Sequence, residues 1–168
     1  LNELSTLKSR FLQATSTGNY TEGTFYLSRP GKMRIEYDPP AQLLIVADGT
    51  WLIYHDLELD NITHLPLGAT PANILLQKKI TLLSGGLEVS KVERAPGIIG
   101  VTVVPSDEDS GHLTLIFADK PLELKKWIVV DSQGVTTSIS LLSTQRDISF
   151  DPKLFNIKLK QQEMQSDN

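Results

Sequence analysis

The sequence predicts a mainly β protein with a helical lid, an α+β fold built on a large antiparallel sheet that curls towards a barrel. Two observations lead to this fold class. Short segments of alternating apolar and polar residues follow one another at regular spacing, separated by turn residues. Two segments have helical spacing, too few to cover both faces of such a sheet, so they are expected to cover its concave face. The 168 residues fit one domain, residues 1–160, followed by a loose polar tail, residues 161–168.

The predicted strands are bounded by pairs of turn residues such as Pro30-Gly31, Asp48-Gly49 and Pro96-Gly97. The strands are expected at residues 20–28, 32–37, 42–47, 51–55, 61–65, 87–95, 98–105, 112–118, 124–131 and 134–145. Side chains alternate between the two faces of a strand. The segment 32–37 is therefore expected to have one apolar face, with Met33, Ile35 and Tyr37, and one solvated face that carries Arg34.

The two predicted helices cover residues 2–14 and 71–83. In the first, Leu4, Leu7 and Phe11 recur at helical spacing. In the second, Thr70 can cap the helix and Pro71 suits its first turn. The apolar cluster Ile74, Leu75 and Leu76 follows.

Composition excludes several classes of function. The net charge is −4 and the basic residues are scattered, whereas nucleic-acid binding needs a concentrated basic surface. The chain has no cysteine, so disulfides, thiolate metal sites and cysteine nucleophiles are absent, which fits an oxidising compartment. No apolar run approaches the roughly 20 residues that span a bilayer. Because the sequence starts at Leu1 without methionine, a signal peptide is expected to have been removed.

No residue pattern predicts an enzyme, a metal site or a cofactor. The three histidines are isolated, and no nucleophile elbow or phosphate-binding glycine loop is present. A lipid hydrolase would need a nucleophile and a base at one site, and Ser28 and His55 are weak candidates for these roles. The acidic run 107–109 is expected to be a solvated loop.

Arg29 is the most informative polar residue of the chain. If the alternation of strand 20–28 continues, Arg29 falls on the same face as Phe25 and Leu27. A guanidinium directed into an apolar surface must find acceptors or stay close to water, because burying an unpaired charge is costly. Arg29 is therefore expected to be a rim residue or a latch, the alternative being a surface ion pair that contributes little to stability.

The motifs in residues 23–54 resemble those of the periplasmic outer-membrane lipoprotein carrier family, LolA. They are Gly23-Thr24-Phe25-Tyr26-Leu27-Ser28-Arg29-Pro30, Met33-Arg34-Ile35-Glu36-Tyr37, Pro39 and Asp48-Gly49-Thr50-Trp51-Leu52-Ile53-Tyr54. Thr70-Pro71 and the closing segment 150–157 extend the resemblance over nearly the whole chain. Family members often carry tryptophan where Ile35 stands, a difference that bears on cavity size.

The resemblance implies an incomplete antiparallel β-barrel whose concave face is covered by helices. It also implies a monomeric periplasmic carrier that takes lipid-modified proteins from an inner-membrane release complex and passes them to an outer-membrane acceptor. Arg29 would be the latch that holds the lid. The acyl chains would contact an apolar cavity lined by Phe25, Leu27, Met33, Ile35, Tyr37, Ile45, Ile74, Leu75 and Leu76. The alternative is an envelope-sensing or protein-interaction module on the same half-barrel.

Overall fold

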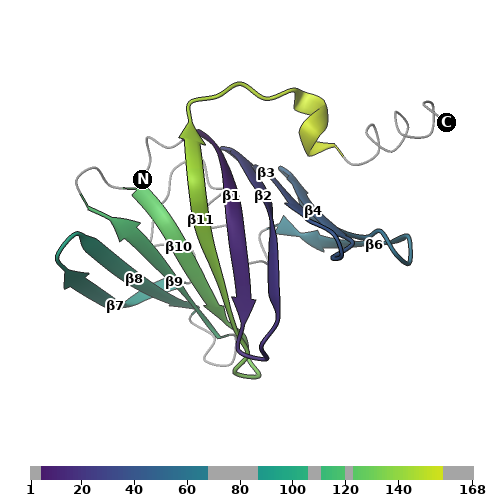
Figure 1. The fold of residues 1–168 in the computed structure, drawn as a ribbon. Helices are drawn as coiled ribbons and strands as arrows, with labels where there is room; N and C mark the ends of the chain where they lie inside the picture. The colour runs from purple at the N-terminus through teal and green to yellow at the C-terminus, as the bar shows by residue number, and fades with distance from the viewer. Residues whose placement is uncertain (1–4, 68–86, 106–110, 120–122, 157–168) are drawn as a thin grey trace. The chain divides into compact units, whose positions relative to one another are not determined.

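Strands dominate the part of the chain that the structure describes. The computed structural model describes residues 5–67, 87–105, 111–119 and 123–156. The strands are β1 (Thr6–Thr15), β2 (Tyr20–Ser28), β3 (Lys32–Tyr37), β4 (Leu43–Asp48), β5 (Trp51–Asp56), β6 (Asn61–Pro66), β7 (Leu87–Ala95), β8 (Ile98–Pro105), β9 (His112–Ala118), β10 (Glu123–Val130) and β11 (Thr136–Arg146). Hydrogen bonds join them in the order β6-β5-β4-β3-β2-β1-β11-β10-β9-β8-β7 (Figure 1). The predicted antiparallel sheet of short strands is thus confirmed.

The chain forms two compact units, and each is described separately. The first unit contains the described residues of the ranges 10–22 and 79–143. The second unit contains the described residues of the ranges 2–9, 23–78 and 144–168. The first unit holds β7 to β10 and most of β11. The second holds β3 to β6, the greater part of β2 and the last residues of β11.

The first unit packs a row of large side chains on one face of β9, β10 and β11. Trp127 on β10 is opposite Leu115 on β9 and Ile139 on β11, and all three are buried. The register shifts between Leu124 and Lys126. This irregularity keeps Leu124 and Trp127 both buried although they are three positions apart, because an extra residue restores the alternation.

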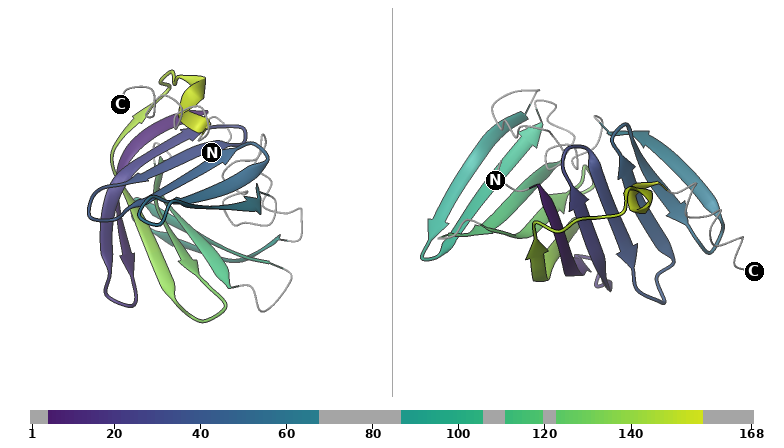
Figure 2. Two further views of the ribbon diagram at one scale, coloured as in Figure 1. Left: turned by 90° about the vertical axis from the view of Figure 1, so that its right-hand side faces the viewer. Right: turned by 90° about the horizontal axis from the view of Figure 1, so that it is seen from above.

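The second unit is built from successive antiparallel hairpins (Figure 2). Their turns need glycine, since Gly31 and Gly49 have φ angles of +79° and +105°. The turns at these glycines also lie against each other: a Cβ added to Gly31 would lie 2.9 Å from the Cα of Gly49. The turn pairs recognised in the sequence therefore help to set the register within the β2–β3 and β4–β5 hairpins.

The predicted helix at residues 2–14 is wrong. Residues Thr6–Thr15 form strand β1 instead. Leu7, Ser9 and Phe11 are buried and alternate with exposed Lys8 and Arg10, which is the period of a strand. Ser9 belongs to the buried face because its Oγ shares a hydrogen bond of 3.0 Å with Thr144 Oγ1 on β11.

The predicted α+β class with a helical lid is also wrong for this structure. The described residues contain no long helix. They include the four-residue 3-10 helix η2 (Pro152–Phe155), which Asp151 caps by accepting a hydrogen bond from the Lys153 N–H. Residues 71–83, where the second helix was expected, lie outside the described residues. No helix in the described part of the chain is long and apolar enough to cross a membrane.

The face of β3 expected to be solvated is covered by the end of the chain. Arg34 is 4% exposed. Its Nε donates to Glu36 Oε1 at 2.6 Å, and its Nη1 donates to the Leu154 carbonyl oxygen at 2.9 Å. The segment that includes η2 packs on β3 and β4. There Phe155 contacts a core formed with Val46 and Ile53. Both faces of this part of the sheet therefore carry apolar packing.

Candidate functional site

Two rows of side chains form an apolar face on β2 to β5. Residues paired directly across antiparallel strands share a face. One row is Phe25, Ile35, Ile45 and Tyr54, and the next is Leu27, Met33, Ala47 and Leu52. We call these eight residues the apolar face. Seven are buried and Tyr54 is half-buried.

The predicted lining residues of β2, β3 and β4 are thus brought together. Phe25, Leu27, Met33, Ile35 and Ile45 all belong to the apolar face. Tyr37 is opposite Gly23 at the end of the same face and is half-buried. Whether these residues line a ligand cavity stays a prediction. The predicted lining residues Ile74, Leu75 and Leu76 lie outside the described part of the chain.

Ala47, Leu52 and Tyr54 were missed as members of this face. Their membership follows from the register of the β4–β5 hairpin, in which Ala47 pairs with Leu52 and Ile45 with Tyr54. The turn pair Asp48-Gly49 was the sequence signal that could have placed them. Tyr54 contributes the hydroxyl group of the apolar face, and desolvation by burial raises its pKa. The apolar face carries no charged side chain.

Arg29 directly follows the last residue of β2. Its backbone N–H donates to the Ser5 carbonyl oxygen at 2.8 Å. The side chain is half-buried, and desolvation lowers the pKa of its guanidinium. Continued alternation from Phe25 and Leu27 assigns Arg29 to the edge of the apolar face. Its expected partner, the segment 71–83, lies outside the described residues, so the latch stays a prediction.

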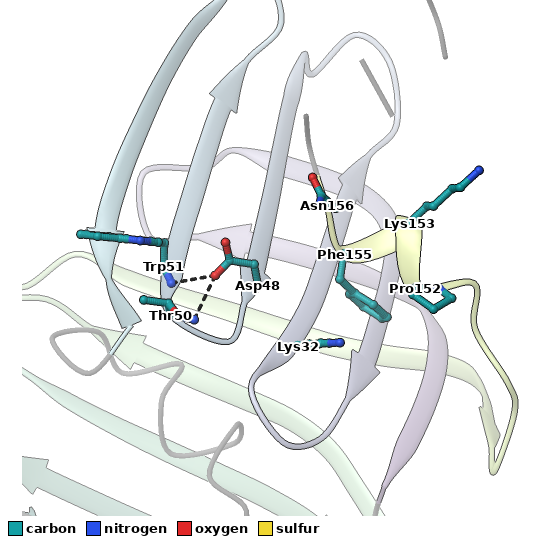
Figure 3. Close-up of a pocket in the computed structure, with 8 residues that line it drawn as sticks. All are labelled: Lys32, Asp48, Thr50, Trp51, Pro152, Lys153, Phe155 and Asn156. Carbon is teal, nitrogen blue, oxygen red and sulfur yellow. Dashed lines mark hydrogen bonds between the residues drawn. The ribbon is translucent and has the colours of Figure 1, made fainter. Parts of the chain in front are cut away.

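A separate pocket of about 580 Å³ lies beside the C-terminal segment. It is lined by Lys32, Asp48, Thr50, Trp51, Pro152, Lys153, Phe155 and Asn156 (Figure 3). Asp48 Oδ1 accepts from the backbone N–H groups of Thr50 and Trp51, both at 2.9 Å. Lys32, Asp48 and Trp51 have the strand parity opposite to that of the apolar face. The pocket contains none of the predicted lining residues.

The polar groups of the described residues form no centre for metal binding. No group of three or more His, Asp or Glu side chains in the described ranges could hold an ion. His55 is buried, and its Nε2 is 2.9 Å from Asp60 Oδ1. The buried His55 ring therefore has a hydrogen-bond partner in Asp60.

Solved structures of other proteins have a similar fold. A LolA superfamily protein from Nitrosomonas europaea has a similar structure, with a TM-score of 0.52 and 9% identity over 93% of this chain and 92% of that one. The MucB-containing MucA/MucB complex of Pseudomonas aeruginosa gives a TM-score of 0.52 and 13% identity, covering 91% of this chain and 56% of that one. At these identities the likeness concerns the fold alone.

The family follows from sequence. The family of outer membrane lipoprotein carrier proteins, LolA, matches residues 2–158, and the chain belongs to it. The outer-membrane lipoprotein carrier protein of Dechloromonas aromatica is 32% identical over 161 residues, which are 88% of this chain and 74% of that relative. The one from Methylobacillus flagellatus is 33% identical over 130 residues, 75% of this chain and 62% of that relative. The predicted resemblance is confirmed.

Proposed function

We propose that this protein is a periplasmic carrier that binds the acyl chains of lipoproteins and shuttles them, as a monomer, from the inner to the outer membrane. The observation that carries the proposal is the apolar face, eight side chains in two cross-strand rows without a charged group, in a chain of the lipoprotein carrier family. An inner-membrane release complex would load the carrier and an outer-membrane acceptor would unload it.

The physical need for such a carrier follows from the hydrophobic effect. Each methylene moved out of water contributes about 0.8 kcal/mol, so an acylated anchor does not cross an aqueous space unaided. An aliphatic face shields acyl chains without directional bonds, which suits cargoes of differing sequence. Release requires a competing state of similar free energy, either the closed empty carrier or the acceptor. Binding and release are the whole task, and neither requires a catalytic group.

The direct test compares a lipid-modified peptide with its unmodified twin. We expect saturable binding of the acylated peptide alone, measured by calorimetry. An acyl chain that carries a photoreactive group should label β2 to β5 at the apolar face. Equal binding of both peptides, or labelling confined to the opposite face at Arg34 and Val46, would contradict the proposal.

The size of the binding space can be tested at Ile35. Ile35→Trp adds bulk to the apolar face, so it should weaken binding of a triacylated peptide more than that of a monoacylated one. Lys32→Trp is the matched control, because Lys32 is exposed on the same strand and has the opposite parity. Equal effects of the two variants on acyl binding would argue against the apolar face as the binding surface.

Arg29 is proposed to hold the apolar face closed when no cargo is bound. Arg29→Leu should then increase binding of a hydrophobic dye to the free protein, whereas Arg29→Lys retains the charge and should have a smaller effect. A guanidinium makes several charge-assisted hydrogen bonds that an ammonium group cannot reproduce. Dye binding unchanged in both variants would reject the latch and leave acyl binding itself untouched.

A further inference from the structure

The edge strand β6 is accessible along its whole length. Among the described residues it pairs with β5 alone and stands at one end of the strand order. All six of its residues are exposed. An edge strand offers a row of backbone N–H and C=O groups to a further strand, so natural sheets usually protect such edges with charges, bulges or covering segments.

The two edge strands of the sheet differ in the number of charged residues that they carry. At the other end of the strand order, β7 carries the charged residues Lys91, Glu93 and Arg94, and Lys91 Nζ pairs with Glu93 Oε1 at 2.6 Å. Strand β6 has the sequence Asn-Ile-Thr-His-Leu-Pro, which contains no Asp, Glu, Lys or Arg. Thus β7 has the charges that discourage strand addition, whereas β6 has none.

Apolar side chains are also exposed around β6. Within the described residues, five of the nine large apolar side chains that are exposed lie in the β5–β6 hairpin: Trp51, Leu57, Leu59, Ile62 and Leu65. Trp51 packs edge-on against His64 of β6, with ring centroids 6.2 Å apart. An incoming strand would therefore gain side-chain contacts as well as backbone hydrogen bonds.

The turn between β5 and β6 adds negative charge in a fixed geometry. Its sequence, Asp56-Leu57-Glu58-Leu59-Asp60, alternates acidic and apolar residues. Asp56 Oδ1 accepts from the Glu58 and Leu59 N–H groups at 3.0 and 3.1 Å, and Asp60 bonds to His55. These bonds order the turn, while Leu59 remains 74% exposed and Glu58 is exposed.

We propose that the β5–β6 hairpin docks an extended segment of a partner protein, which adds to the β6 edge as a further strand. The partner segment has alternating apolar residues and carries lysine or arginine where it meets the acidic turn at residues 56–60. Main-chain hydrogen bonds would give affinity and the exposed side chains specificity. Opposite charges would orient the encounter and make association sensitive to salt. Leu65 pairs with Leu52 and so continues the apolar face, but docking at the backbone edge of β6 does not depend on the acyl-binding role proposed above.

The test uses the full chain and a synthetic probe. The probe is an end-capped peptide of alternating valine and threonine with a lysine at each end. We expect slower hydrogen exchange at residues 61–66 when the probe binds, and a blue shift of tryptophan fluorescence, because Trp51 is exposed whereas Trp127 is already buried. A peptide N-methylated at alternate residues should not bind, and a twin ending in glutamate should bind about tenfold more weakly at low salt.

Two matched variants locate the surface. Ile62→Lys places on β6 the kind of charge that β7 already has, so it should abolish probe binding. Val92→Lys makes the same change at an exposed position on β7 and should leave probe binding intact. Both variants should still bind an acylated peptide. Loss of probe binding with retained acyl binding therefore separates this inference from the carrier function.

Several outcomes would overturn the inference. They are no exchange protection at residues 61–66, equal binding of the N-methylated peptide, or equal effects of Ile62→Lys and Val92→Lys. A dimer that forms without probe and is broken by Ile62→Lys would assign the edge to a second copy of this chain. A shift of Trp51 fluorescence with phosphatidylcholine vesicles but not with the peptide would assign the surface to a membrane.

Discussion

Removing the buried cation Arg34 should release the end of the chain from the sheet. Arg34 bridges Glu36 on its own strand and the Leu154 carbonyl oxygen, 120 positions away. The variant Arg34→Met keeps an apolar stem of similar length and removes both polar contacts. Arg34→Ala removes the packing of the stem as well. Comparing them separates the two contributions.

The size of the effect can be worked out from the contacts. Losing a charged donor from a partly buried carbonyl costs about 1.5–3 kcal/mol. Glu36 has a side chain that is 36% exposed, so the ion pair contributes no more than about 1 kcal/mol after solvent screening. We therefore expect Arg34→Met to lower the free energy of unfolding by about 3 kcal/mol. Arg34→Ala should cost about 1–2 kcal/mol more, because it leaves a cavity.

Urea unfolding monitored by tryptophan fluorescence measures this loss. The midpoint should fall while the slope stays constant, and hydrogen exchange at residues 150–156 should accelerate. Lys32→Met is the control, since Lys32 lies on the same strand face and is exposed; it should change stability by less than about 0.5 kcal/mol. An Arg34→Met protein as stable as the wild type, with unchanged exchange at residues 150–156, would refute the role of Arg34 as an anchor.

Three further perturbations test other parts of the structure. Leu27→Ala at a fully buried position should cost about 2–5 kcal/mol by urea titration; a smaller loss would mean that the apolar face collapses around the gap. Gly31→Ala should lower the melting temperature through both its positive φ and its contact with Gly49, and should do so more than Gly134→Ala, which has a positive φ but no neighbour within 4 Å. Burial raises the pKa of Tyr54, so its contribution to stability is complete below the unfolded value of about 10 and is lost as pH rises through the folded value. Stability should therefore fall more steeply above pH 10 or so in the wild type than in Tyr54→Phe, and parallel pH profiles would contradict this.

Local sequence patterns were sufficient for most strands but not for β1. The turn glycines Gly31, Gly49 and Gly97 all have positive φ, and the strands that they join lie within a residue or two of their predicted bounds. In β1, Leu7 and Phe11 are four positions apart, a spacing that fits one face of a helix and also one face of a strand. The polar Ser9 between them concealed the alternation, because its partner Thr144 is 135 positions away.

The grouping of residues on the apolar face was predictable to the same degree. Alternation within β2 and β3 grouped Phe25, Leu27, Met33 and Ile35 correctly, since parity is a local property. Ala47 and Leu52 belong to the same face because of the register of the β4–β5 hairpin. The alternation of residues within one strand does not fix that register. Arg34 was expected in solvent because nothing in β3 reveals that Leu154 returns to cover it. A contact between distant segments decided the difference at Arg34, whereas the register of one hairpin decided the placement of Ala47 and Leu52.

The closing segment has a consequence for biosynthesis. Val46 and Ile53 emerge from the ribosome about a hundred residues before Phe155, which buries them. The hydrogen bond between Ser9 and Thr144 likewise forms only after Thr144 has been synthesised. A nascent chain therefore cannot complete this unit until residues 144–155 have been synthesised, and contacts of such long sequence separation form slowly. A product truncated before η2 would expose the apolar side chains that Phe155 covers, and such exposed apolar surface is bound by holdase chaperones and degraded by proteases.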